Sequence, residues 1–422
     1  MTYLDYAATA PLVSEARAAM EPFIADAGHL FGNANSLHQT GRDAFALLED
    51  LRVSLARTLG ARRPDEIVFT SGATESDNAA LIGIALGMRE ERRLAGRATS
   101  GRVVMSRIEH HAVLNCDRML RALGFDVSFV DNDAAGRIPP EALERVMDDD
   151  VVLVSIMMAN NEVGTVQPIA GLARVARTHG ARFHTDAVQA FGKLPVDVDA
   201  LGADALSLSA HKVGGPKGQG ILYLRTGTPF VAYLAGGGQE RGLRSGTQDV
   251  MGIAGSVAAF AQAAAHADAE GSRLALLRDA AYARLSAVPG VTPTLASAIG
   301  PGFLPNIVNV CVRGWESQSL VLHLDMRGFS VSGGSACSSN SLSPLMCCPH
   351  AASTASVPKG RCVCRSAPTR RSKTWKPSRR RSKISSRQGI GDGYADGGRA
   401  RAQASRAVSG LGRRAVGSHR PA

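Results

Sequence analysis

The 422-residue chain lacks long apolar runs, and no stretch approaches the roughly 18 uninterrupted apolar residues that a membrane helix needs. It also lacks a recognisable signal peptide, because Asp5 stands where a basic segment and an apolar core would be required. We therefore expect a cytoplasmic protein with no membrane span. Thiols stay reduced in that compartment, so an isolated cysteine such as Cys337 is able to react.

Acidic residues are nearly missing from residues 345–422, which hold 18 Lys and Arg against 2 Asp and Glu. Residues 1–344 hold 30 and 35, so the whole net charge of +11 comes from the tail. The tail also carries four of the seven cysteines and almost no apolar periodicity. Taken as it stands, it predicts a basic, disordered extension that binds nucleic acid non-specifically through charge.

Polar residues follow several predicted buried strands at the point where each strand ends. The apolar run VVLVSIMMA (151–159) is typical of a buried parallel strand and is followed by Asn161. HTDAVQ (184–189) follows another strand and contains Asp186 and Gln189, while Lys212 follows a third. The carboxyl ends of strands in an open α/β sheet are where ligands bind. A lysine there can be desolvated and used as an amine nucleophile.

A glycine turn at Gly72 separates a short strand from a helix whose first turn holds Ala73 and Thr74. Free backbone N–H groups at a helix start, with a hydroxyl beside them, form a phosphate site. On its own the turn fits an ordinary helix cap equally well. Combined with the strand-end lysine and aspartate, it predicts a pyridoxal phosphate site. The lysine forms the Schiff base, the aspartate pairs with the pyridinium nitrogen and the helix start holds the phosphate.

Eight motifs in chain order resemble cysteine desulfurases of the bacterial NifS and IscS type, which are class V aminotransferase-like enzymes of fold-type I. The motifs are LDYAATAP (4–11), VFTSGATESDN (68–78), IEHHAVLN (108–115), ANNEVGTVQPI (159–169), HTDAVQ (184–189), SAHKVGGPKG (209–218), GGGQERGLRSGT (236–247) and SGGSACSS (332–339). The resemblance runs from Leu4 to about Pro344. It implies an α/β protein whose large domain has a mainly parallel, seven-stranded type of sheet between helices, joined to a smaller α+β domain.

The resemblance also implies domain boundaries. Residues 1–15 would pack with the small domain, and residues 16–255 would form the large pyridoxal phosphate-binding domain. Residues 256–344 would form a small domain that is incomplete. Residues 345–422 would be a basic, disordered tail.

The resemblance implies a role for each site residue. Lys212 would attach pyridoxal phosphate, Asp186 would keep its ring nitrogen protonated, and Gln189 would bind its ring hydroxyl. His110 would stack on the ring and assist proton transfer. Further contacts would be made by Ala73, Thr74, Ser209 and His211 to the phosphate, by Thr247 to the phosphate from the other subunit of a homodimer, by Asn161 between cofactor and substrate, and by Asn33 to the substrate carboxylate. No metal is implied.

Cys337 is the implied nucleophile. Its surroundings, GGSACSSNSLSP (333–344), are small and polar, as in a mobile exposed loop. A free thiol has a pKa of about 8.5, so it needs a nearby base or positive charge to react as thiolate. The implied reaction removes sulfur from L-cysteine, releases L-alanine and leaves a persulfide on Cys337. An acceptor such as an iron–sulfur scaffold or a tRNA-thiolation enzyme would take the sulfur.

A shift of reading frame explains the basic tail better than a natural extension does. Read one base earlier, the codons from Leu345 permit S-H-V-L, and those of residues 360–378 permit G-A-L-R-V-S-L-G-P-D-T-T-E-Q-D-V-E-A-F, which resembles the family's closing strand and helix. Two positions are forced, because methionine and tryptophan have single codons: Met346 yields Val and Trp375 yields Glu. We therefore hypothesise a single-base deletion near Pro344.

The lost frame would carry the family's substrate-carboxylate arginine, where this chain has CVC at 362–364. We expect weak or absent desulfurase activity, the loss of a small-domain strand and its covering helix, exposure of the run NIVNVCV (306–312), and no structure after about residue 344. Two alternatives stay open. One is a non-catalytic, basic-tailed module that binds nucleic acid or protein. The other, within the enzyme class, is a selenocysteine lyase.

Overall fold

The computed structural model describes residues 1–24, 30–296, 298–334 and 361–365. Its largest element is a seven-stranded sheet in the order β2-β8-β7-β6-β5-β3-β4. The strands are β2 (Ile67–Thr70), β3 (Arg102–Ser106), β4 (Asp126–Val130), β5 (Val151–Ser155), β6 (Arg182–Asp186), β7 (Ala205–Ser209) and β8 (Gly220–Leu224). β8 pairs antiparallel with both of its neighbours, β2 and β7, and the other adjacent strands of the sheet pair in parallel. The predicted mainly parallel sheet and the fold class are confirmed.

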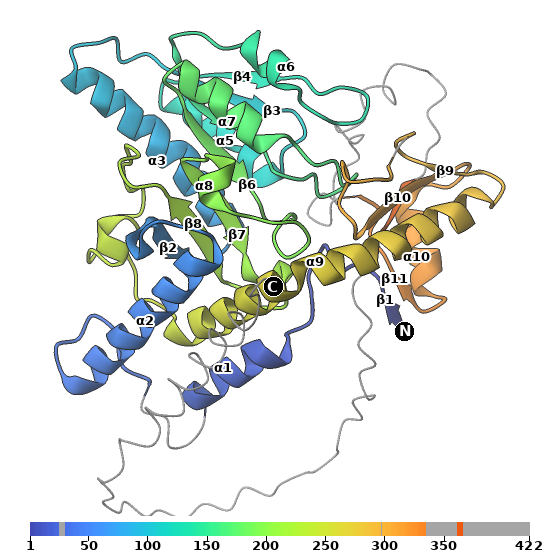
Figure 1. The fold of residues 1–422 in the computed structure, drawn as a ribbon, viewed down its shortest axis with the longest axis horizontal. Helices are drawn as coiled ribbons and strands as arrows, with labels where there is room; N and C mark the ends of the chain where they lie inside the picture. Colours follow the sequence, from blue (N-terminus) through green and yellow to red (C-terminus); the bar gives the residue numbers. More distant parts are fainter. Residues whose placement is uncertain (25–29, 297, 335–360, 366–422) are drawn as a thin grey trace, which may run out of the picture.

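Helices cover both faces of this sheet (Figure 1). Successive side chains of a strand point to opposite faces, and β3 shows why both must be covered. Val103 and Met105 pack in one apolar cluster with residues of α3, whereas Val104 packs in the other. The helices of the large domain are α2 (Gln39–Thr58), α3 (Ala73–Leu94), α4 (His111–Leu114), α5 (Cys116–Ala122), α6 (Pro140–Glu144), α7 (Ile169–Thr178) and α8 (Val198–Leu201), with short 3-10 turns η1 (Pro64–Glu66), η2 (Ala210–Lys212) and η3 (Glu240–Gly242).

A single 37-residue helix, α9 (Val250–Ser286), connects the large and small domains. Its first part packs against α1 (Ser14–Ile24) and α2, and its later part against the small-domain strands β9 (Val291–Pro293) and β10 (Ile307–Val312). The expected boundary between residues 255 and 256 therefore falls inside a continuous helix. By length and composition α9 could cross a membrane, but 61% of its most apolar window is buried within the protein. Core helices of soluble proteins share these properties, so this is weak evidence for a span.

The small domain also contains α10 (Ser317–Asp325), β11 (Phe329–Ser330) and β12 (Arg361–Arg365), and β12 pairs antiparallel with β10. The expectation that no structure follows residue 344 is therefore wrong at β12, and so is the expected loss of a strand. Backbone groups make this pairing, and an open strand edge accepts an extended segment of almost any sequence. The remainder of residues 345–422 lies outside the described residues.

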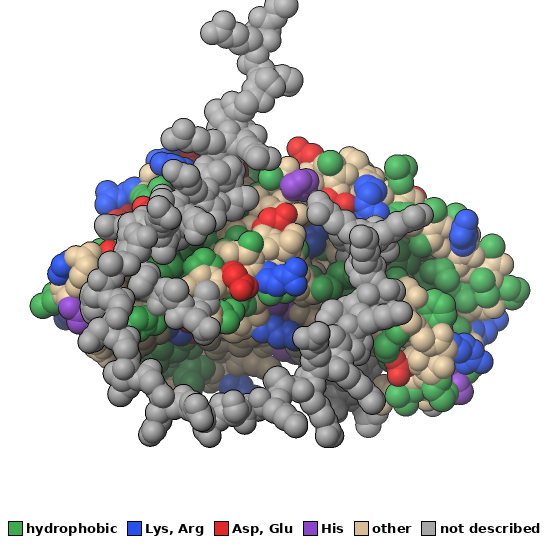
Figure 2. Space-filling view, turned by 90° about the horizontal axis from the view of Figure 1, so that it is seen from below, with side chains coloured by type: hydrophobic (Ala, Val, Ile, Leu, Met, Phe, Trp, Pro, Cys, Tyr) green, Lys and Arg blue, Asp and Glu red, His purple; other side chains and the backbone are tan. Residues whose placement is uncertain are grey.

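The expected exposure of residues 306–312 is also wrong, because Ile307, Val308 and Val310 are buried. In this domain, exposed apolar side chains lie on and just after α10, which has no buried residue: Leu322 is 65% exposed, and Met326, directly after the helix, is 72% exposed. Hydrophobic side chains reach the surface at this end of the molecule (Figure 2).

The N-terminal segment contacts both domains. β1 (Thr2–Tyr3) pairs in parallel with β11 of the small domain. Ala10 and Val13 donate their backbone N–H groups to the carbonyls of His211 and Gly214, at 2.8 and 2.9 Å, in the large domain. Residues 1–15 therefore do more than pack with the small domain, and they place the loop after β1 beside the carboxyl ends of the central strands.

Candidate active site

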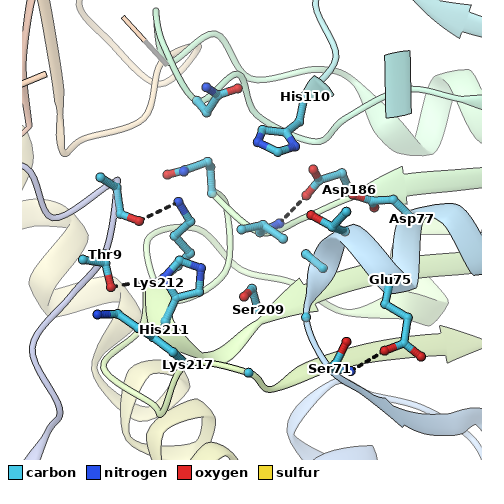
Figure 3. Close-up of a pocket in the computed structure, with 18 of the residues that line it drawn as sticks. Thr9, Ser71, Glu75, Asp77, His110, Asp186, Ser209, His211, Lys212 and Lys217 are labelled. Carbon is cyan, nitrogen blue, oxygen red and sulfur yellow. Dashed lines mark hydrogen bonds between the residues drawn. The ribbon is translucent and has the colours of Figure 1, made fainter. Parts of the chain in front are cut away.

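A cavity of about 460 Å³ lies at the carboxyl ends of the central strands, beside the start of α3. Figure 3 shows how the side chains that line it converge. Every predicted cofactor-binding residue except Thr247 lines it. The lining residues are Ala8, Thr9, Ser71, Gly72, Ala73, Thr74, Glu75, Asp77, His110, Met157, Asn161, Asp186, Val188, Gln189, Ser209, His211, Lys212, Lys217 and Gly218. The fold brings these residues together because parallel strands end at one edge of the sheet.

Lys212 reaches the cavity from η2, the turn that directly follows β7. Its Nζ donates hydrogen bonds to the carbonyl oxygens of Ala7, at 2.7 Å, and Ala8, at 3.0 Å. The N-terminal segment thus holds the amine at the cavity. A second amine, Nζ of Lys193, donates to the Lys212 carbonyl at 3.3 Å, and burial together with the charge of Lys212 lowers the pKa of Lys193 to about 8.

Asp186 is the last residue of β6 and is buried. Its Oδ1 accepts a hydrogen bond from the backbone N–H of Val188 at 2.9 Å. Burial raises the pKa of Asp186, while the positive charges of His110 and Lys212 favour its ionised form. In Figure 3, Asp186 and the Lys212 amine lie on different sides of the cavity, with His110 near its upper rim.

The start of α3 forms another wall. Its N-cap, Gly72, makes no side-chain capping bond, so no side chain at that position competes for the first-turn N–H groups. Gly220, the first residue of β8, packs against this turn. Only glycine fits at position 220, because a Cβ there would lie 2.5 Å from the Gly72 Cα. Ser209 and His211 complete this wall. Burial and three nearby lysines lower the pKa of His211 to about 4, so the ring is neutral at pH 7.

Several residues that line the cavity were not predicted from the sequence as site residues, although they lie within the quoted motifs. Thr9 Oγ1 and His211 Nδ1 form a hydrogen bond of 3.2 Å, and Lys217 lies five residues after Lys212. Glu75 forms an ion pair with Arg244 at 2.8 Å, which ties the loop 236–247 to the first turn of α3. Asp77 follows Ala73 by one helical turn and so shares its face. That spacing was the signal for Asp77.

Three predicted residues do not line the cavity described here. Thr247 and Asn33 are exposed. They lie on one surface, because Asn33 Oδ1 accepts the N–H of Asn35, and Asn35 in turn donates to Gln248, next to Thr247, at 2.9 Å. Cys337 lies outside the described residues.

The comparisons with known proteins agree with this geometry. The family model for aminotransferase class-V matches residues 2–357. The chain belongs to this family. The match passes the predicted limit near Pro344 and leaves residues 358–422 outside.

Curated relatives cover most of the chain. "Cysteine desulfurase IscS" of Dictyoglomus turgidum is 42% identical over 357 residues, which cover 84% of this chain and 86% of the relative. "Cysteine desulfurase NifS" of Azotobacter vinelandii is 40% identical over 342 residues, covering 81% of this chain and 82% of the relative. The predicted resemblance to the NifS and IscS type is confirmed.

Solved structures share the fold. One described as a NifS-like protein has a TM-score of 0.77 and 33% identity, and the match covers 87% of this chain and 93% of that one. A structure titled "SspA in complex with cysteine" has a TM-score of 0.72 and 33% identity, covering 87% and 99%.

Proposed function

We propose that this chain is a pyridoxal phosphate-dependent cysteine desulfurase, which takes sulfur from L-cysteine and releases L-alanine. The observation that carries the proposal is one cavity with three features: the strand-end amine of Lys212, the buried carboxyl of Asp186 and the start of α3. These residues fit pyridoxal phosphate, because they supply an amine for attachment, an anion for the ring nitrogen and N–H groups for the phosphate. When bound, pyridoxal phosphate acts as an electron sink.

Two groups in the cavity are placed to move protons, Nζ of Lys212 and the ring of His110. His110 is the N-cap of α4, and its Nδ1 accepts the backbone N–H of Ala112 at 3.1 Å. A proton on the neutral ring therefore resides on Nε2, and we assign proton transfer to that atom. Gln189 donates its Nε2 to the Ala7 carbonyl at 3.0 Å, which leaves Oε1 to accept a hydrogen bond from the cofactor's ring hydroxyl. Asn161, which also lines the cavity, is assigned to contacts between cofactor and substrate.

We further propose that Cys337 is the sulfur acceptor within the enzyme. Its thiolate attacks the substrate sulfur, so that a sulfur–sulfur bond forms as the substrate's carbon–sulfur bond breaks. The persulfide then passes its sulfur to an acceptor protein in the cytoplasm, such as an iron–sulfur scaffold or a tRNA-thiolation enzyme. The names of the curated relatives support L-cysteine as the substrate.

A homodimer that shares its two sites is the assembly we propose. Support comes from the surface that carries Asn33 and Thr247, where two large apolar side chains are almost fully exposed: Phe31 at 82% and Leu37 at 90%. Apolar side chains this exposed are typical of a surface that a partner covers. In such a dimer Thr247 reaches the partner's phosphate site, and Asn33 its substrate.

We also propose that residues after about Pro344 result from a single-base deletion and that the altered chain has impaired activity. The family match, which leaves residues 358–422 outside, supports this. Resequencing the gene tests the deletion, and an intact frame shared by close relatives contradicts it. Restoring the frame should raise alanine release more than tenfold, because losing one partner of a desolvated charge pair costs about 2 to 5 kcal/mol.

The purified chain loaded with pyridoxal phosphate tests the main proposal. We expect a visible absorbance band in the wild type and in the control Lys217→Ala, which removes a lysine from the same cavity, but none in Lys212→Ala. Borohydride reduction and peptide mapping should place the adduct on residue 212. A colourless wild type, or an adduct on Lys193, contradicts the assignment. An alanine assay beside the spectrum separates loading from turnover, and faster turnover of selenocysteine than of cysteine would identify a selenocysteine lyase.

A further inference from the structure

A second carboxyl group lies next to Asp186 in the cavity wall. Asp77 belongs to the second turn of α3 and is 0% exposed, and Figure 3 shows it beside Asp186. Neither of its carboxyl oxygens has a hydrogen-bond partner within 3.5 Å in the part of the chain that the structure describes. A buried carboxylate without close partners loses its hydration and gains little in return.

The nearest basic group does not supply a charge. Nε2 of His184 lies 3.6 Å from Asp77 Oδ1. His184 is already held between two hydroxyl groups, Ser155 on Nδ1 at 2.9 Å and Ser207 on Nε2 at 3.0 Å. Burial lowers the pKa of His184 to about 3, so the ring is neutral at pH 7.

The other titratable groups around Asp77 are acidic or neutral. Burial raises the pKa of Asp77 well above its ordinary value, and the neighbouring carboxylate of Asp186 raises it further. A hydrogen-bonding interaction with the Ser207 hydroxyl opposes this rise, and Glu109 adds a smaller increase. Cys116 of α5 stays a neutral thiol, because burial is the main cause that raises its pKa, to about 12. The groups of this region that favour an ionised carboxylate, His110 and Lys212, act on Asp186.

The two neighbouring carboxyl groups therefore differ. Asp186 accepts a backbone hydrogen bond from Val188, and Lys212 and His110 favour its ionised form. Asp77 accepts no such backbone hydrogen bond, and neither Lys212 nor His110 is among the groups that shift its pKa. When two carboxyl groups share a buried site, the better-solvated one ionises and the other keeps its proton.

We propose that Asp77 is a protonated carboxylic acid in the folded protein, and that it leaves Asp186 as the ionised carboxylate at this end of the cavity. Asp77 is then a positioning residue, since it confines the negative charge to Asp186. Where the proposed function holds, Asp186 alone is the counter-ion of the cofactor's ring nitrogen.

The first test measures melting temperatures of the full chain, wild type and Asp77→Asn, between pH 5 and pH 8. A proton held in the folded state is released in the unfolded state above the ordinary aspartate pKa of about 4. The wild type therefore loses stability relative to Asp77→Asn as pH rises. We expect the melting temperature of Asp77→Asn minus that of the wild type to grow by roughly 2 °C per pH unit.

Asp50→Asn is the matched control, because Asp50 is an exposed carboxyl on α2. Its difference from the wild type should stay level over the same range. A level or falling difference for Asp77→Asn overturns the proposal. This test needs no cofactor, so its failure is distinct from a failure of the proposed function.

Infrared spectroscopy gives a second measurement if Asp77→Asn does not fold. A protonated-carboxyl band at pH 7 should persist in both Glu109→Gln and Asp186→Asn. Glu109→Gln is included because burial raises the pKa of Glu109 to about 8. Loss of the band in either variant, or its absence from the wild type, overturns the proposal.

A third measurement addresses the cofactor, using pyridoxal phosphate labelled with nitrogen-15 in its ring. We expect the chemical shift of a protonated ring nitrogen in the wild type and in Asp77→Asn, and its loss in Asp186→Asn. A deprotonated nitrogen in Asp77→Asn would show that Asp77 carries a charge, and would overturn the proposal. Absence of any bound signal in the wild type would count against the proposed function instead.

Discussion

Replacing Glu240 with alanine should destabilise the protein through the charge that it leaves behind on Arg52. The two side chains form a bidentate ion pair, with Nη1–Oε2 at 2.6 Å and Nη2–Oε1 at 2.9 Å, and they are only 1% (Arg52) and 3% (Glu240) exposed. Glu240 also accepts the backbone N–H of Phe69 at 3.0 Å. Removing one partner of a buried ion pair typically costs about 3 to 5 kcal/mol, because the remaining charge stays buried.

The remaining contacts of Arg52 set the expected value within that range. Arg52 still donates to the Ile67 carbonyl at 2.7 Å and to Glu49 at 2.9 Å, and its guanidinium lies 4.7 Å from the centre of the Phe69 ring. These contacts retain part of the stabilisation, so we expect a loss near the lower end, about 3 kcal/mol in free energy of unfolding. The midpoint and slope of urea unfolding, followed by circular dichroism, measure it.

The double variant Arg52→Met/Glu240→Met separates the buried charge from the lost contacts. It should be more stable than Glu240→Ala, because it removes both charges and refills the space with apolar atoms. A loss below about 1 kcal/mol for Glu240→Ala, or a double variant whose loss equals the sum of its single substitutions, would refute the reasoning.

Burial alone would raise the pKa of Glu240, but the hydrogen bonds and charge of Arg52 outweigh it and hold that pKa below its usual value. The ion pair's contribution is therefore present above the unfolded pKa of about 4.3 and is lost as pH falls through the lower folded value.

Four further predictions follow from the site and its supports. His110→Gln should lower alanine release by about 10² to 10⁴-fold while the visible absorbance band remains, and an unchanged rate would exclude Nε2 as the proton-transferring atom. Arg244→Met should weaken pyridoxal phosphate binding by roughly tenfold, since it frees Glu75 in the first turn of α3, and fluorescence titration measures this. Gly220→Val should lower the free energy of unfolding by about 1 to 3 kcal/mol, because its Cβ would overlap the backbone of the turn at the start of α3. Deleting residues 366–422 should abolish salt-sensitive DNA binding and leave the absorbance band intact, and DNA binding that survives the deletion would place the basic site elsewhere.

Much of the site was predictable because its residues follow directly from local patterns. The apolar run of β5 and the strand-like segments before Asp186 and Lys212 predicted buried parallel strands, and parallel strands present their ends at one edge. The glycine turn predicted the start of α3, which forms the wall of the cavity proposed to hold the phosphate. These inferences needed only residues within a few positions of each other.

Contacts between distant parts of the chain were decided by the tertiary structure. The carbonyls of Ala7 and Ala8 hold an amine more than 200 residues away, and β12 pairs with β10 across an interval whose length no pattern specifies. Asp77 is an ordinary helical aspartate in the sequence. Its proposed proton depends on burial against Asp186 and a neutral His184, and burial is a property of the packed fold. Strand ends and turns are determined by neighbouring residues, whereas the charge state of a side chain depends on everything packed around it.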